Sequence, residues 1–197
     1  MDLYHGDCLE IMPTIPDNSI DMILCDLPYG TTACKWDVVI PFDKLWLEYN
    51  RVIKKGGCIA LFGSEPFSSY LRMSNIKNYK YDWIWEKSRP SGHLNAKKMP
   101  LKNIENICIF YKEQCLFNPQ FSKGNPNNVR DGSIRESKAT NNIYGEFKNS
   151  IQKRTDQKYP KQSLFFKQQD PKKIIHLTQK PVKLFTFLIF LYKSLLV

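Results

Sequence analysis

The chain has 197 residues, enough for one hydrophobic core and an appended lobe, and its six cysteines form no Cys-x-x-Cys pair. That spacing argues against a metal site or a disulfide framework. The formal net charge of +10 at pH 7 favours a polyanionic partner, and an aromatic content of 13% would serve base stacking as well as a core. The amino terminus lacks the basic and apolar regions of a secretory signal, so a reducing cytoplasm is the expected location.

The first predicted element is a short helix over Cys8–Met12, ended by Pro13 and Pro16. Gly6 and Asp7 come directly before it. An aspartate at this position is well suited to accept from the first free backbone N–H groups, so Asp7 is predicted to cap the helix.

The stretch from Asp21 to Gly30 combines an apolar run with an abrupt polar end. Met22–Cys25 is typical of a buried strand, and Pro28 keeps Leu27 out of the helical region. Gly30 then allows a turn. The pattern predicts that Asp26 and Tyr29 lie at the carboxyl end of a strand, where open α/β sheets bind ligands. A purely structural turn is the alternative for so short a motif.

A helix and a second strand follow. Apolar residues recur at helical spacing from Phe42 to Ile53, and Lys54-Lys55 with Gly56-Gly57 favour a helix end there. Cys58–Phe62 is predicted to be a buried strand, and Gly63–Pro66 a turn into another helix with Ser64 as its cap. Alternation of strands and helices predicts a parallel sheet with crossovers.

Two further strands, Tyr81–Trp85 and Asn106–Tyr111, are rich in aromatic and β-branched residues. The polar, basic stretch Glu86–Lys102 between them is predicted to be a surface loop, and a loop that faces DNA is the sharper hypothesis. Residues 118–173 then lack a sustained helical or strand period. A solvated insert is the simplest interpretation of that segment.

The last segment begins with His176-Leu-Thr-Gln-Lys-Pro181, predicted to be a turn before a helix that starts near Pro181. Leu184–Val197 is apolar nearly all round. At about 14 residues it is too short for a bilayer, which needs roughly 20. We expect a core helix that lacks the sheet it should cover.

Several of these segments together resemble the amino-group DNA methyltransferases that carry an Asp-Pro-Pro-Tyr motif. Asp26-Leu-Pro-Tyr29 matches that motif except at Leu27, and His176-Leu-Thr-Gln-Lys-Pro181 matches the family's His-Pro-Thr-Gln-Lys-Pro except at Leu177. Gly92, Asn95–Lys98 and Pro100 are also in step with a family segment. The resemblance runs from about Leu3 to about Ile189, in an order that places the catalytic motif first.

The resemblance implies a permuted, Rossmann-like α/β fold and an S-adenosylmethionine-dependent DNA adenine-N6 methyltransferase of the phage or restriction-modification type. It implies a catalytic portion over 1–117, a target-recognition insert over 118–173 and a return to the core over 174–197. The implied catalytic residues are Asp26, Leu27, Pro28 and Tyr29. The implied residues for S-adenosylmethionine are Asp7, His176, Thr178, Gln179, Lys180 and Pro181.

Double-stranded DNA is the implied partner. In the family the insert contacts phosphates and base edges, so its basic residues are candidates for this role. The candidate DNA-binding residues, in the insert and in the loop before it, are Lys97, Lys98, Lys153, Arg154 and Lys158.

The family's glycine-rich cofactor loop has no counterpart, since the nine glycines include no Gly-x-Gly. We therefore expect a fold that is incomplete after residue 197, weak binding of S-adenosylmethionine by this chain alone, and a second chain or an oligomer that completes the cofactor site. Two alternatives stay open: a catalytically inactive DNA-binding remnant, and an N4-cytosine methyltransferase. The second is disfavoured because Asp, and not Ser, begins the motif.

Overall fold

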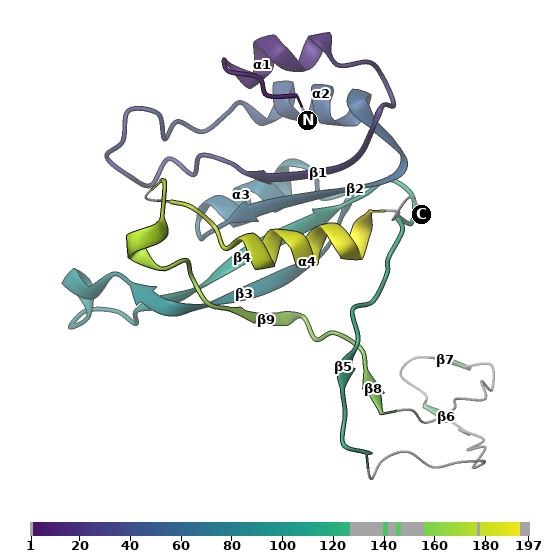
Figure 1. Ribbon diagram of the computed structural model, residues 1–197. Helices are drawn as coiled ribbons and strands as arrows, with labels where there is room; N and C mark the ends of the chain where they lie inside the picture. The colour runs from purple at the N-terminus through teal and green to yellow at the C-terminus, as the bar shows by residue number, and fades with distance from the viewer. Residues whose placement is uncertain (1, 127–139, 142–144, 147–155, 177, 194–197) are drawn as a thin grey trace. The chain divides into compact units, whose positions relative to one another are not determined.

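The computed structural model describes residues 2–126, 140–141, 145–146, 156–176 and 178–193 (Figure 1). The chain divides into two compact units, one of Met1–Asn118 with Lys161–Val197 and one of Pro119–Pro160. The second unit holds the short strand pairs β5 (Ser122–Lys123) with β8 (Gln157–Lys158) and β6 (Thr140–Asn141) with β7 (Gly145–Glu146). The three-part domain division from the sequence stays a prediction.

The first unit is built on a five-stranded sheet in the order β1-β2-β4-β3-β9. Its strands are β1 (Ile20–Asp26), β2 (Ile53–Gly63), β3 (Tyr79–Ser91), β4 (Lys102–Phe110) and β9 (Ser163–Phe166). The β1–β2 and β3–β9 pairs are parallel, whereas β4 is antiparallel to both of its neighbours. The predicted parallel arrangement therefore holds for β1 and β2, and β4 is the one reversed strand of this sheet.

Helices cover both faces of this sheet. On one face, α2 (Phe42–Val52) and α3 (Phe67–Ser74) pack with Ile59, Leu61 and Phe110. On the other face lies α4 (Val182–Tyr192), in front of the strands in Figure 1. Leu184, Leu188 and Leu191 are fully buried against it. The expectation that this last helix lacks a sheet to cover is therefore wrong.

Two predicted helix boundaries also need correction, namely the last residue of α2 and the N-cap of α3. Helix α2 ends at Val52, because Ile53 begins β2 and pairs with Ile20 of β1. Lys54 and Lys55 are thus strand residues and not a last helical turn. Helix α3 has Pro66 at its N-cap with no side-chain cap hydrogen bond, so the predicted cap by Ser64 is wrong.

The amino-terminal helix was predicted more accurately. Helix α1 spans Cys8–Ile11 and continues into the 3-10 turn η1 (Met12–Thr14). The Asp7 carboxylate accepts a hydrogen bond of 2.8 Å from the Leu9 N–H, which confirms Asp7 as the cap of this helix. Within the described ranges, none of the helices has the length and apolar character of a membrane span.

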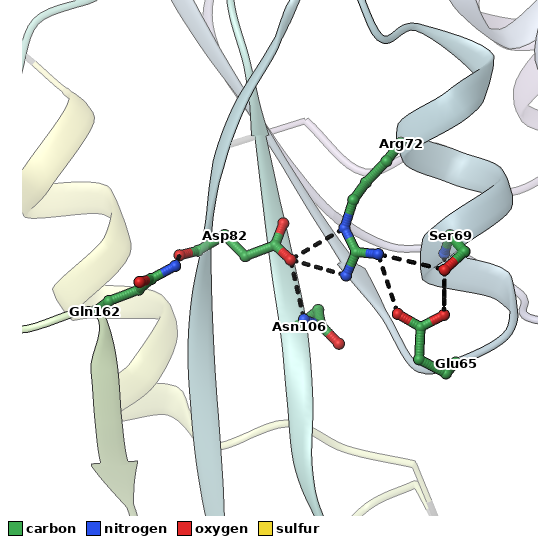
Figure 2. Close-up of polar contacts among 6 residues, drawn as sticks. All are labelled: Glu65, Ser69, Arg72, Asp82, Asn106 and Gln162. Carbon is green, nitrogen blue, oxygen red and sulfur yellow. Dashed lines mark hydrogen bonds and ion pairs between the residues drawn. The ribbon is translucent and has the colours of Figure 1, made fainter.

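A polar network ties α3 to the sheet (Figure 2). Arg72 of α3 donates to Asp82 Oδ2 of β3 through Nε at 3.0 Å and Nη2 at 2.8 Å, and to Glu65 Oε1 through Nη1 at 3.0 Å. Asn106 of β4 donates to the same Asp82 oxygen at 3.0 Å. The Gln162 side chain, just before β9, donates to the Asp82 carbonyl at 2.6 Å. The Asp82 carboxylate therefore joins the last turn of α3 to β3 and β4, and Arg72 also contacts Glu65 just before α3 begins.

Candidate active site

The Asp26 and Tyr29 side chains meet where β1 ends. Asp26 is the last residue of β1, and Pro28 leads the chain out of the sheet, as predicted. The Tyr29 hydroxyl donates to Asp26 Oδ1 at 2.9 Å. Burial, together with the charges of Asp26 and Glu105, raises the pKa of Tyr29, so the phenol keeps the proton that it donates. The tyrosine ring stacks on Phe67 of α3 with a centroid distance of 5.0 Å.

The second oxygen of Asp26 contacts a lysine from the far side of the sequence. Lys180 Nζ lies 2.9 Å from Asp26 Oδ2 and 3.2 Å from Glu105 Oε2 of β4. Glu105 Oε1 in turn lies 3.2 Å from Lys87 Nζ of β3. Because the side chains of Lys87, Glu105 and Lys180 are only 10–13% exposed, these opposite charges are poorly screened by water.

The loop after Tyr29 is closed by Asp37. The Asp37 carboxylate accepts from the backbone N–H groups of Gly30, Thr31 and Thr32 at 2.9, 3.0 and 2.7 Å. Burial raises the pKa of this carboxyl, but the hydrogen bonds from Thr32 and the backbone outweigh that effect and lower the pKa to about 2. Gly30 sits at φ +66°, and a Cβ there would lie 2.9 Å from Val39 Cγ2. These hydrogen bonds stabilise the loop, and a side chain at position 30 would strain it.

These elements enclose a pocket of about 230 Å³. Ligand pockets for drug-sized molecules are typically about 300–1,000 Å³, so this pocket suits one ring or one end of a larger ligand. Its walls combine a carboxylate, an ammonium group and aromatic rings. The lining residues are Asp26, Leu27, Pro28, Tyr29, Thr31, Thr32, Trp36, Asp37, Thr178 and Lys180.

The segment before α4 supplies the residues predicted to contact a cofactor, and only some of them reach this pocket. Thr178 and Lys180 line it. His176 Nδ1 is 2.9 Å from Thr178 Oγ1, and the Gln179 side chain accepts from the Ile175 N–H at 2.9 Å, which stabilises the turn. Pro181 is the N-cap of α4, as the sequence predicted.

One other predicted site residue, Asp7, does not line this pocket. Its carboxylate caps α1. Leu177, the departure from the family motif, lies outside the described residues. Among the described residues, no group of three or more His, Cys, Asp or Glu side chains is placed to hold a metal ion.

The candidate DNA-binding lysines fall in different parts of the chain. Lys97 and Lys98 are exposed and follow the short turn η2 (His93–Asn95) between β3 and β4. Because β1 and β3 run in the same direction, that turn and Asp26 lie at the same edge of the sheet (Figure 1). Lys158 is exposed on β8 of the second unit. Lys153 and Arg154 lie outside the described residues.

Sequence reasoning missed Asp37 and Glu105. An aspartate a few residues after Gly30-Thr-Thr32 is a recognisable signal, since a carboxylate commonly binds consecutive N–H groups in a turn. Glu105 gives no such signal. Its role depends on the register of three strands. Asp26 of β1 pairs with Phe62 of β2, and Phe62 pairs with Ile107 of β4, two residues after Glu105.

Several solved structures have a fold similar to that of this chain. The structure of M1.HpyAVI with S-adenosylmethionine superposes with a TM-score of 0.56 at 20% identity, covering 97% of this chain and 76% of that one. The cytosine-N4-specific PvuII DNA methyltransferase gives a TM-score of 0.57 at 14% identity, covering 97% and 70%. The chain therefore has the α/β fold of S-adenosylmethionine-dependent methyltransferases, which confirms the predicted fold class.

Two type II methyltransferases are similar to this chain in sequence. Type II methyltransferase M.BamHI from Bacillus amyloliquefaciens is 28% identical over 92 residues, and type II methyltransferase M.HinfI from Haemophilus influenzae is 30% identical over 116 residues. These matches cover 39% and 45% of this chain but only 22% and 32% of the relatives, so the chain matches about a third or less of their length. No model of a protein family matches the sequence. The chain is therefore similar in sequence to type II methyltransferases, which agrees with the resemblance of its motifs.

Proposed function

We propose that this protein is a site-specific DNA methyltransferase that transfers a methyl group from S-adenosylmethionine to the N6 amino group of adenine. One observation carries the proposal: Asp26 lies at the carboxyl end of β1, in a pocket with Tyr29 and Lys180, within a methyltransferase fold. The sequence relatives, which are type II methyltransferases, support the same reaction class.

The chemistry requires help from the protein because the amine's lone pair is delocalised into the purine ring. In the proposed role, Asp26 accepts one amine N–H and the Leu27 carbonyl accepts the other, which favours a pyramidal nitrogen with its lone pair directed at the methyl group. Each carboxylate oxygen has two acceptor sites, so Asp26 can accept the amine while it keeps Tyr29 and Lys180. The proton that the methylated amine releases can pass to the same carboxylate.

Tyr29 is proposed to stack on the target base. Phe67 stacks on one face of its ring and the Lys180 ammonium lies 5.7 Å from the ring centroid, so a base would contact the part of the ring that these two groups leave open. The base must first be flipped out of the duplex, at a cost of a few kcal/mol. Stacking on an aromatic side chain offsets about 1–3 kcal/mol of that cost.

The carboxylate and the aromatic rings that line the pocket fit the positively charged, methyl-bearing end of S-adenosylmethionine. This cofactor supplies an electrophilic methyl group on a positively charged sulfur. The Asp26 carboxylate and the rings of Tyr29 and Trp36 line one pocket and would stabilise such a cation. Thr178 and Lys180 also line this pocket and are proposed to bind the methionine portion. His176, Gln179 and Pro181 are proposed to contribute from the same turn before α4, and Asp7, which caps α1, is proposed to bind a part of the cofactor outside this pocket.

DNA contact is proposed through the exposed lysines Lys97 and Lys98, and through the 118–173 segment with Lys153, Arg154 and Lys158. Residues 161–173 of that segment also contribute β9 to the main sheet, so its recognition role would concentrate in the second unit. The fold similarity to a cytosine-N4-specific enzyme keeps N4-cytosine as the second candidate substrate.

The test uses PCR-amplified DNA, which carries no methyl groups, with S-adenosylmethionine bearing a deuterated methyl group. After digestion to nucleosides, mass spectrometry should find deuterated N6-methyladenine with the wild-type chain and none with Asp26→Ala. Deuterated N4-methylcytosine would move the proposal to the second substrate. The absence of both methylated nucleosides would contradict the proposed activity for this chain.

A further inference from the structure

Trp36 differs from the other tryptophans of this chain. The side chain is 56% exposed, whereas Trp46, Trp83 and Trp85 are 6%, 4% and 2% exposed. Keeping a large apolar ring in water forgoes the stabilisation that its burial would give. An exposed tryptophan is therefore informative when it stands beside a pocket, as Trp36 does.

The indole is also held in place. Its neighbour Asp37 accepts three backbone N–H bonds from Gly30, Thr31 and Thr32, and the Asp37 N–H donates to the Cys34 carbonyl at 3.0 Å. The Trp36 ring lies 5.8 Å from the His176 ring at an interplanar angle of 58°. A ring fixed on a closed loop loses little conformational entropy when it binds a ligand.

The other aromatic ring that lines this pocket is more fully engaged. The Tyr29 ring stacks on Phe67 at an interplanar angle of 24°, and the Lys180 ammonium lies 5.7 Å from its centroid. Its hydroxyl donates to Asp26. The most open aromatic surface in the pocket therefore belongs to Trp36.

We propose that Trp36 is a substrate-contacting residue that stacks on the purine base whose amino group Asp26 binds. Trp36 and Asp26 line the same pocket, so a ring held by one is within reach of the other. The pocket volume of about 230 Å³ is enough for one planar ring system. This proposal rests on the proposed function because it names the base as the ring that is bound.

Intrinsic fluorescence provides a test that needs no methyl transfer. A dodecamer of deoxyadenylate, dA12, is titrated into the wild-type chain, and an abasic dodecamer with the same phosphates is the matched ligand. Quenching by dA12 but not by the abasic strand is expected. Trp36→Phe should lose the quenching, because its three remaining tryptophans are buried.

Affinity supplies the second readout. Stacking contributes about 1–3 kcal/mol per base, so Trp36→Ala should weaken dA12 binding about five-fold or more and leave abasic binding unchanged. Tyr70→Ala removes another exposed aromatic side chain, on α3 and outside the pocket lining, and should change neither affinity. Circular dichroism checks that each variant is folded.

Three results would overturn the proposal: quenching that persists in Trp36→Phe, an unchanged affinity of folded Trp36→Ala for dA12, or a Trp36-dependent response to S-adenosylmethionine that dA12 does not compete with. The last result would assign the ring to the cofactor's adenine. Methylation that survives Trp36→Ala at full rate with unchanged DNA affinity would support the proposed function and reject this inference. Trp36-dependent binding of dA12 without any methylation would support this inference and reject the proposed function.

Discussion

The Lys180 ammonium lies 2.9 Å from the Asp26 carboxylate, which joins the turn before α4 to the end of β1. Glu105 shares the same ammonium at 3.2 Å and also pairs with Lys87. Positive and negative groups alternate along this cluster. Each charge therefore has an opposite partner, which offsets a desolvation cost of several kcal/mol per buried ion.

Asp26→Ala should abolish methyl transfer and leave DNA affinity nearly unchanged. The carboxylate is proposed to act on the base amine, whereas affinity comes largely from phosphate contacts. Labelled methyl incorporation and fluorescence anisotropy with duplex DNA measure the two effects separately. Asp21→Ala, an exposed carboxylate at the other end of β1, is the matched control and should retain activity. Turnover by Asp26→Ala would show that another group is the catalytic one.

Glu105→Ala should destabilise the fold by about 3–5 kcal/mol, because it removes the carboxylate that pairs with the nearly buried Lys87 ammonium and one of the two that pair with Lys180. Urea unfolding followed by circular dichroism gives the free energy of unfolding. Glu86→Ala, an exposed carboxylate on β3, is the control and should change it little. Equal effects of the two substitutions would mean that the cluster contributes no stability.

DNA binding should depend steeply on salt, since each neutralised phosphate releases counterions. Replacing Lys153, Arg154 and Lys158 with serine together should flatten the slope of log affinity against log salt by up to about 2.7, at about 0.9 per lost contact. The control replaces Lys54 and Lys55, which pair with Asp21 and Glu113 near the amino end of β2. An unchanged slope in the triple variant would return the insert to the role of a solvated segment.

Some features could be predicted because they depend only on residues that are neighbours in the sequence. Asp26 follows an apolar run and precedes Pro28, so the end of β1 and the carboxylate placed there could be inferred without a structure. The last residue of α2 could not be inferred in this way. Lys54-Lys55-Gly56-Gly57 has the composition of a helix end, but pairing of Ile53 with Ile20 extends the strand over it.

The contacts of the site needed the tertiary structure. Lys180 belongs to a recognisable motif, yet its position between Asp26 and Glu105 depends on how α4 docks and on the register of β2 with β4. Helix α4 shows the same limit. Its sequence is apolar nearly all round and does not reveal which surface it covers, whereas the packed structure buries Leu184, Leu188 and Leu191 against the sheet.

Asp37→Asn tests the loop that carries Trp36. The carboxylate accepts three backbone N–H bonds, and an amide offers one acceptor oxygen and an N–H₂ group that opposes the donors. We expect a loss of about 1–3 kcal/mol in the free energy of unfolding at pH 7. Asp2→Asn, at an exposed position, is the control and should be neutral.

The pH dependence of this loss identifies its cause. The folded-state pKa of Asp37 is lowered to about 2 from the ordinary value of 3.8, so the unfolded chain binds this proton more readily. The stabilisation is therefore complete above about pH 4 and declines as the pH falls towards 2. Urea unfolding of the wild type and Asp37→Asn at pH 7, 5, 4 and 3 should give a stability difference that is constant down to about pH 4 and smaller at pH 3. A difference that stays constant down to pH 3 would show that the ionised carboxylate is not what closes the loop.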